Sequence, residues 1–169
     1  MSPTDRGSLH LHLLRHADAG DPAAWRGDDA ARPLSPKGEA QAERLGAFLA
    51  GAGFRTDAVI SSPKVRARRT AEIVAEAVRA TVRLDDRLAG GFDPATVDAI
   101  LADAGDPDRP VLVGHDPDFS SLLGWLAGTD ALTMKKGAFA RLDVRGPVAN
   151  GRGTLRWLVP PDLLDPERS

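Results

Sequence analysis

Cysteine is absent from the 169 residues of the sequence. Its absence excludes a disulfide framework, metal or iron–sulfur sites with cysteine ligands, and catalysis by a cysteine nucleophile. Long apolar runs are also missing, since the longest extend over a few residues whereas a membrane-spanning helix needs about 20. The opening residues MSPTDRGS are polar and lack the apolar core of a secretory signal. We therefore expect a cytoplasmic protein without a membrane partner.

Neither sign of charge dominates the sequence. The 22 Lys and Arg residues against 24 Asp and Glu residues give a net charge of −2, so we do not expect the strongly basic face of a nucleic-acid-binding protein. The glycines form neither a dinucleotide-binding fingerprint nor a P-loop. Ser61 and Ser62 lack the glycines of a Gly-x-Ser-x-Gly elbow. Nucleotide-cofactor dehydrogenases, P-loop enzymes and serine hydrolases are therefore disfavoured.

The composition is otherwise that of a folded domain. Hydrophobic residues make up 42% and charged residues 27% of the chain, which excludes wholesale disorder. A length of 169 residues predicts one domain. We expect a disordered N-terminal arm over residues 1–8, a single domain over residues 9–164 and a C-terminal tail over residues 165–169.

Strands and helices are predicted to alternate along the chain. One helix is expected to begin with Ser35 as its N-cap and Pro36 at its first position, and to be stopped by Gly51 and Gly53. The alternation predicts an α/β fold, a three-layer α/β/α sandwich whose mostly parallel central sheet has an antiparallel edge. The last two strands are expected to form a hairpin at the Asn-Gly pair of residues 150–151. The other predicted elements are strands at 9–14, 57–61, 81–84, 110–114, 139–145 and 154–159, and helices at 64–78, 94–104 and 119–127.

Four side chains with phosphate chemistry follow the predicted strands. His16 comes after the first strand with Arg15 beside it, His115 comes after the fourth, and Arg66 lies in the first turn of the helix after the second. Open α/β sheets bind ligands beyond the carboxyl ends of their strands. Arginine matches phosphate oxygens in a bidentate manner, and a neutral imidazole can attack phosphorus. The pattern predicts phosphoryl transfer through a phosphohistidine, with electrostatic stabilisation by the other three residues.

The motifs around these residues resemble those of the histidine phosphatase superfamily. Residues 13–19 (LLRHADA) resemble its Arg-His signature, in the Arg-His-Ala form, and residues 32–38 (RPLSPKG) resemble the segment that opens its first helix. Residues 62–67 (SPKVRA) and 113–117 (VGHDP) resemble its second-arginine and second-histidine motifs. The small size and the closing residues 157–160 (WLVP) resemble the SixA branch, the phosphohistidine phosphatases.

The resemblance implies a phosphoglycerate mutase-like fold and a metal-independent hydrolase that needs no cofactor. It implies that His16 is the nucleophile that becomes phosphorylated, while Arg15, Arg66 and His115 hold the phosphoryl group. The substrate it implies is phosphohistidine in a protein partner. A small phosphorylated metabolite, hydrolysed by the same mechanism, is an alternative substrate, and a non-catalytic phosphate-binding module is an alternative function.

The proton donor for the leaving group stays open among three aspartates. Asp116 directly follows His115, where the resemblance to the acid-phosphatase branch places the donor, and we rank it first. Asp18 lies two residues beyond His16, and Asp86 lies in the loop after the third predicted strand. A phosphorylated imidazole leaves readily once its other ring nitrogen is protonated, so the proposed substrate needs less help from an acid.

Three further residues are candidates for substrate binding. Arg32 either shapes the pocket entrance or anchors its loop to Asp28 or Asp29. Trp25 lies in the long loop over residues 17–32, where it either contacts the substrate or fills a small satellite core. Lys136 belongs to a lysine pair before a predicted strand, and either reaches the substrate or is simply exposed.

Two histidines outside these motifs alternate along the first predicted strand. His10 and His12 are therefore expected on one face of the sheet. Two histidines on one face are a possible start for a metal site, but no third ligand accompanies them in the sequence. We expect these two residues to be structural, and no metal site is predicted.

Overall fold

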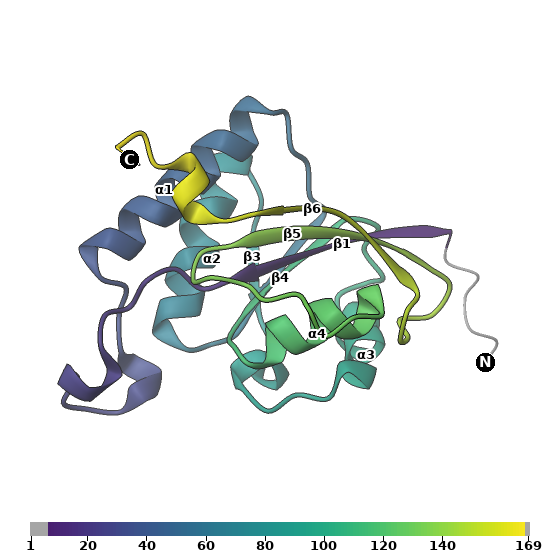
Figure 1. Ribbon diagram of the computed structural model, residues 1–169, viewed down its shortest axis with the longest axis horizontal. Coiled ribbons are helices and arrows are strands. Elements are labelled where there is room, and N and C mark those ends of the chain that lie inside the picture. Colours follow the sequence, from purple (N-terminus) through teal and green to yellow (C-terminus); the bar gives the residue numbers. More distant parts are fainter. Residues whose placement is uncertain (1–6, 168–169) are drawn as a thin grey trace.

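The computed structural model describes residues 7–167. Its six strands form one sheet in the order β3-β2-β4-β1-β5-β6 (Figure 1). The first four strands pair in parallel and the last two pair antiparallel at one edge, so the predicted sheet is confirmed. The strands are β1 (Ser8–Arg15), β2 (Ala58–Ser61), β3 (Val82–Leu84), β4 (Pro110–Gly114), β5 (Phe139–Arg145) and β6 (Gly153–Val159).

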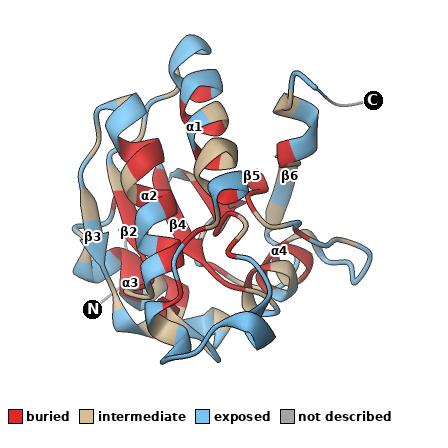
Figure 2. Ribbon diagram, turned by 90° about the vertical axis from the view of Figure 1, so that its left-hand side faces the viewer, coloured by how far each residue is buried: buried red, intermediate tan, exposed pale blue. Residues whose placement is uncertain are grey.

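Helices cover both faces of the sheet, which gives the predicted three-layer sandwich (Figures 1 and 2). The helices α1 (Pro36–Gly51) and α2 (Val65–Val78) pack on one face, and α3 (Val97–Asp103) and α4 (Asp118–Ala127) pack on the other. Within residues 7–167, no helix is both long enough and apolar enough to cross a membrane.

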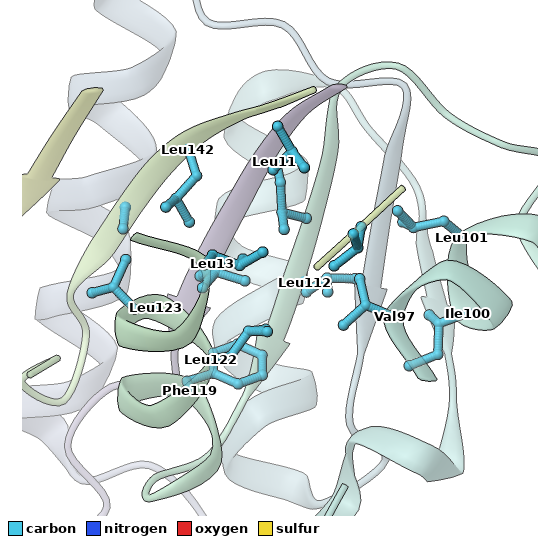
Figure 3. Close-up of a cluster of buried hydrophobic side chains, with 14 of the residues drawn as sticks. Leu11, Leu13, Val97, Ile100, Leu101, Leu112, Phe119, Leu122, Leu123 and Leu142 are labelled. Atoms are coloured by element: carbon cyan, nitrogen blue, oxygen red, sulfur yellow. The ribbon is translucent and has the colours of Figure 1, made fainter. Parts of the chain in front are cut away.

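Strand β1 supplies both hydrophobic cores because its side chains alternate between the two faces. Leu11 and Leu13 pack toward α3 and α4, in the same cluster as Phe119 and Leu122 (Figure 3). Leu14 belongs to the other cluster, with residues from α1 and α2. Burial of a leucine side chain of this kind stabilises the fold by about 1.5–3 kcal/mol. The two cores together hold the strand whose end carries Arg15.

Most predicted element boundaries agree with the structure to within one residue. Ser8, predicted in the disordered arm, pairs with Arg145 as the first residue of β1, and the arm's residues 1–6 lie outside the described residues. The predicted helix 94–104 is divided into a 3₁₀-helix (Pro94–Thr96) and the shorter α3, because the Asp93 carboxylate caps the amide of Ala95 in a tight first turn. In the hairpin, β5 ends at residue 145 as predicted, β6 begins one residue earlier than predicted, and the Asn-Gly pair of residues 150–151 lies in the loop between them.

The start of α1 is tied to the segment that follows His16. Ser35 caps the helix as predicted, since its hydroxyl accepts a hydrogen bond from the Gly38 amide at 3.1 Å. The carbonyl of Asp18 accepts a bond from the Ser35 amide at 3.0 Å. A Cβ atom at Gly38 would lie 1.9 Å from this carbonyl oxygen. Only glycine therefore allows the helix to approach the backbone beyond His16 this closely.

The variant Gly38→Ala is expected to lose stability, because its methyl group must displace the Asp18 backbone. Overpacking of this kind costs about 1–3 kcal/mol. Urea denaturation of the two variants Gly38→Ala and Gly51→Ala provides the measurement, since a Cβ at Gly51 meets nothing within 4 Å. Equal free energies of unfolding for the two variants would contradict this account.

Candidate active site

Two adjacent parallel strands bring the two predicted site histidines together. Arg15 at the end of β1 lies opposite Gly114 at the end of β4. The amide of His16 donates a hydrogen bond to the Gly114 carbonyl at 3.0 Å. The rings of His16 and His115 then lie 5.1 Å apart, centroid to centroid. Arg66 faces the same point from the first turn of α2 and, with its charge, disfavours protonation of both rings.

His16 is a neutral ring with one nitrogen free to act as a nucleophile. Burial, and to a smaller extent the nearby charges of Arg66 and Arg15, lower the pKa of His16 to about 4, so the ring is unprotonated at neutral pH. Its Nδ1 lies 2.7 Å from the carbonyl oxygen of Ala17. Since a carbonyl can only accept, Nδ1 carries the single ring proton. The lone pair of the ring is therefore on Nε2.

His115 is neutral for the same reason. Burial, and to a smaller extent His16, Arg66 and Lys64, lower its pKa to about 3. Its Nε2 lies 2.7 Å from the hydroxyl oxygen of Ser62. Its Nδ1 is buried without a hydrogen-bond partner among the described residues. An imidazole nitrogen in this position can bond a ligand at low cost, because it has no protein bond to lose.

Arg66 is buried at the base of the site and holds a carboxylate from the long loop. Its Nη2 donates to Asp29 Oδ2 at 2.9 Å, and its Nη1 donates to the Asp29 carbonyl at 2.8 Å. Its Nε is buried without a partner in the described part of the chain. The Asp29 carboxylate and carbonyl thus occupy one Nη group each of a guanidinium whose shape also suits a phosphoryl group. A phosphoryl group that bound to Nη1 or Nη2 would compete with Asp29.

Arg15 is positioned by two acceptors. Its Nη1 donates to the Met134 carbonyl at 2.7 Å and lies 3.3 Å from Asp116 Oδ2. The Asp116 carboxylate also accepts hydrogen bonds from the amide and hydroxyl of Ser120, at 3.0 and 2.6 Å. Asp116, our first candidate for the proton donor, is thus in contact with a predicted phosphate-binding residue and lies two residues before the start of α4.

The other two candidates for the proton donor are less well placed. The hydrogen bond from the Ser35 hydroxyl is the largest cause that lowers the pKa of Asp18, which is the opposite of what a general acid needs at neutral pH. Asp86 lies exposed at the first position of a 3₁₀-helix over Asp86–Ala89. No hydrogen bond or ion pair within residues 7–167 connects Asp86 to the four motif residues.

The three predicted substrate-binding residues have different surroundings. Arg32 anchors its loop, since it donates to the Asp29 carboxylate at 3.1 Å and to the Ala19 carbonyl at 2.7 Å. Trp25 is 38% exposed, and its indole donates to a carbonyl of its own loop. Lys136 lines a cavity beside Arg15. A part in substrate binding stays a prediction for all three.

Two supporting residues were not predicted as site residues. Ser62 contacts His115, and its hydroxyl also accepts the amide hydrogen of Lys64 at 3.2 Å. Thr70 accepts a bond from the Ala17 amide at 3.1 Å and donates to the Arg66 carbonyl at 2.8 Å. The position of each residue in the sequence could have indicated that it supports the site. Ser62 directly follows β2, and Thr70 lies one helical turn after Arg66.

The described side chains around His16 suit an anion and do not form a metal-ligand set. Among the residues that the structure describes, no three His, Asp or Glu side chains gather where they could hold a metal ion. The charged groups around His16 are instead arginines and a lysine. The donor set suits an anion such as a phosphoryl group.

Comparison with known proteins places the chain in a family. The chain is 34% identical over 116 residues to an uncharacterized protein of Picosynechococcus sp., covering 65% of this chain and 68% of that protein. It is 30% identical over 117 residues to the 8-oxo-(d)GTP phosphatase of Mycolicibacterium smegmatis, covering 67% of this chain and 36% of that protein. The solved structure of SixA from Agrobacterium tumefaciens matches with a TM-score of 0.74 and 25% identity, over 89% of this chain and 97% of that chain.

Residues 11–90 match the histidine phosphatase superfamily (branch 1). The chain belongs to the histidine phosphatase superfamily, with the phosphoglycerate mutase-like fold of its SixA-type members. It is a phosphatase, a hydrolase that acts on phosphoric bonds. The resemblance of its motifs to this family is thereby confirmed.

The buried histidines are expected to make the stability depend on pH. The folded pKa of His16 is about 4, against 6.5 for an unperturbed histidine, so the unfolded chain binds the proton more tightly. Stability must then fall as the pH falls from about 6.5 to 4, by on the order of 3 kcal/mol for this residue. Urea denaturation across this range should show a shallower pH dependence in His16→Gln, and an unchanged slope would contradict the assignment.

The contact between Asp29 and Arg66 is expected to weaken phosphate binding. Asp29→Asn removes the competing charge from a half-exposed pair, worth about 0.5–1 kcal/mol, so inorganic phosphate should bind about two- to fivefold more tightly. Isothermal titration calorimetry measures the affinity. Asp28→Asn is the matched control, because that side chain caps the Ala30 amide and makes no contact with Arg66. A similar gain in both variants would show that the competition is not specific to Asp29.

Proposed function

We propose that the chain is a phosphohistidine phosphatase that hydrolyses phosphoryl groups through a phosphorylated His16. The observation that carries the proposal is the tautomer of His16. The Ala17 carbonyl holds the ring proton on Nδ1, and the lowered pKa keeps the ring neutral. Nε2 is therefore ready to attack phosphorus without first losing a proton. Two permanently charged guanidiniums, Arg15 and Arg66, lie close enough to act on this ring.

The reaction has two displacements at phosphorus. In the first, the lone pair of His16 Nε2 forms a bond to phosphorus while the bond to the leaving group breaks, and the leaving group keeps that electron pair. In the second, a water oxygen attacks phosphorus, the bond to Nε2 breaks with its electron pair returning to the ring, and the proton that the water loses passes to bulk solvent. Arg15 and Arg66 neutralise charge on the phosphoryl oxygens in both transition states.

His115 is proposed to donate a hydrogen bond to the phosphoryl group. The Ser62 hydroxyl already accepts the Lys64 amide hydrogen, so its own hydrogen is available for Nε2 of His115. The proton of the neutral His115 ring is then on Nδ1, the buried nitrogen without a partner in the described residues. A donor prepared in this way stabilises the charge that develops on a phosphoryl oxygen.

A protein-borne phosphohistidine is the substrate we propose, because the site holds few groups that suit a general acid. The pKa of Asp18 is lowered, and Asp116 is engaged by Arg15 and Ser120. An imidazole leaving group needs less protonation by the enzyme than an alkoxide does. The similarity to SixA also supports this substrate. A cytoplasmic location stays a prediction.

A small phosphorylated metabolite is the second candidate substrate. It is favoured by the 30% identity to a protein named as an 8-oxo-(d)GTP phosphatase. The cavity beside Arg15, of about 530 Å³, is also large enough for a small molecule. The chemistry at His16 would be the same for both substrates.

Mass spectrometry at alkaline pH, where phosphohistidine survives, distinguishes the two substrates. The protein is mixed with a histidine-phosphorylated phosphotransfer protein, and both partners are analysed over time. Loss of phosphate from the donor, with transient phosphate on His16, is the expected result. Rapid labelling of His16 by small phosphate esters alone would indicate that the substrate is a small phosphorylated metabolite. No labelling and no turnover with any donor would overturn the catalytic proposal.

Arg66→Ala is expected to reduce kcat/KM by about 10²–10³-fold, because it removes a prearranged donor from the transition state. Steady-state kinetics with a chromogenic phosphate ester measure the effect. Arg68→Ala is the matched control, since Arg68 lies on the same helix but pairs with Glu72 on the exposed face. Wild-type activity in Arg66→Ala would show that Arg66 does not stabilise the transition state.

Asp116→Asn tests the proton donor. If Asp116 protonates the leaving group, the variant should slow hydrolysis of an alkyl phosphate by about 10²-fold or more, the usual contribution of a general acid. Hydrolysis of phosphohistidine should be slowed much less, because imidazole is the better leaving group. Single-turnover rates with both substrates make the comparison. Equal losses with both would instead indicate that Asp116 acts by positioning Arg15.

A further inference from the structure

A second cavity of about 500 Å³ lies at the other end of β1. Its walls come from the amino-terminal half of β1, the end of α1, the loop that leads to β2, and strand β6. His10 and His16 are six residues apart on an extended chain, so the cavity is about 20 Å from the nucleophile. Figure 1 shows the two ends of β1 on opposite sides of the molecule. None of the predicted site residues lines this cavity.

Aromatic rings gather at this cavity. The chain has only five phenylalanines and three tryptophans, yet Phe48, Phe54 and Trp157 all line it. Phe48 is 47% exposed, which is unusual for a ring of this size. The rings come from α1, the following loop and β6, so the fold brings them together from distant parts of the sequence. Such walls favour a flat ligand that stacks on them.

His12 adds a neutral polar group to the same cavity. It is 2% exposed, and its ring packs edge-on against Phe54 at 4.9 Å between centroids. Its Nδ1 bonds the Pro110 carbonyl at 3.1 Å, and burial lowers its pKa to about 4. The ring proton is therefore on Nδ1, and Nε2 remains as an acceptor. A buried ring that lines a cavity with a free acceptor can orient a ligand that carries a donor.

The charges at this cavity all have one sign. Arg55, Arg109 and Arg141 line it, and no aspartate or glutamate does. Arg141 is bonded to Asp143 at 3.0 Å. Arg55 and Arg109 are exposed and form no ion pair within residues 7–167. Two unneutralised guanidiniums beside apolar rings are complementary to an anion, although the chain as a whole has a net charge of −2.

We propose that this cavity is a second binding site, for a small planar aromatic anion. The rings of Phe48, Phe54 and Trp157 stack on the ligand's aromatic system. Arg55 and Arg109 bind its carboxylate, sulfonate or phosphate group. The volume lies in the range of sites for small organic ligands, which are mostly apolar with a few placed polar groups. The site is independent of the phosphoryl site and does not rest on the proposed function.

The test uses anilinonaphthalene sulfonate, an aromatic anion whose fluorescence rises in apolar surroundings. We expect saturable binding at one site per chain, weakened about tenfold or more in the double variant Arg55→Gln/Arg109→Gln. Arg152→Gln is the matched control, because Arg152 is an exposed arginine that does not line the cavity. Phenylnaphthylamine, which has the rings without the sulfonate, should bind the wild type about tenfold more weakly than the sulfonate.

Two further measurements locate the bound probe. In the NMR spectrum of labelled protein, the indole N–H signal of Trp157 should shift on binding, while those of Trp25 and Trp125 stay in place. The variant Arg66→Ala, which is altered in the phosphoryl site and not in this cavity, should bind the probe as tightly as the wild type. Weakened binding in Arg66→Ala, a shift of Trp25 in place of Trp157, equal binding of the neutral compound, or an unchanged affinity in the double variant would each overturn the proposal.

Discussion

The parallel pairing of β1 with β4 is the constraint on which the whole site depends. It sets Arg15 opposite Gly114 and joins the His16 amide to the Gly114 carbonyl. A slip of one residue would turn every side chain of the strand to the other face of the sheet. Leu13 and Leu14 are both fully buried, in different cores, so hydrophobic packing opposes such a slip from both faces. The cores thereby determine the 5.1 Å separation of the His16 and His115 rings.

Much of the fold and of the site was predictable because it rests on short patterns. Ser35 and Pro36 start their helix as expected, since capping needs only neighbouring residues. Arg15, His16 and His115 meet because the carboxyl ends of parallel strands share one edge of the sheet. The divided helix at 94–104 was not predictable from apolar spacing, because a 3₁₀-turn and an α-turn place their apolar residues too similarly over a few positions.

Contacts between segments that are distant in the sequence could not be predicted from short sequence patterns. Asp29 and Arg66 are 37 residues apart, and no spacing rule connects a loop carboxylate with a helix arginine. The same holds for the second cavity, where β1, β6 and the end of α1 meet. The alternation of His10 and His12 correctly placed them on one face, but their neighbours Phe54 and Trp157 depend on the sheet order.

The attachment of the long loop to Arg66 has a mechanical consequence. Asp29 uses both its carboxylate and its carbonyl on this guanidinium, and Arg32 of the same loop bonds that carboxylate. If Arg66 binds the phosphoryl group through Nη1 and Nη2, as the proposed function requires, that group must displace Asp29, and the loop would be released and bound again once in each catalytic cycle. The position of the loop would then report whether the site is occupied.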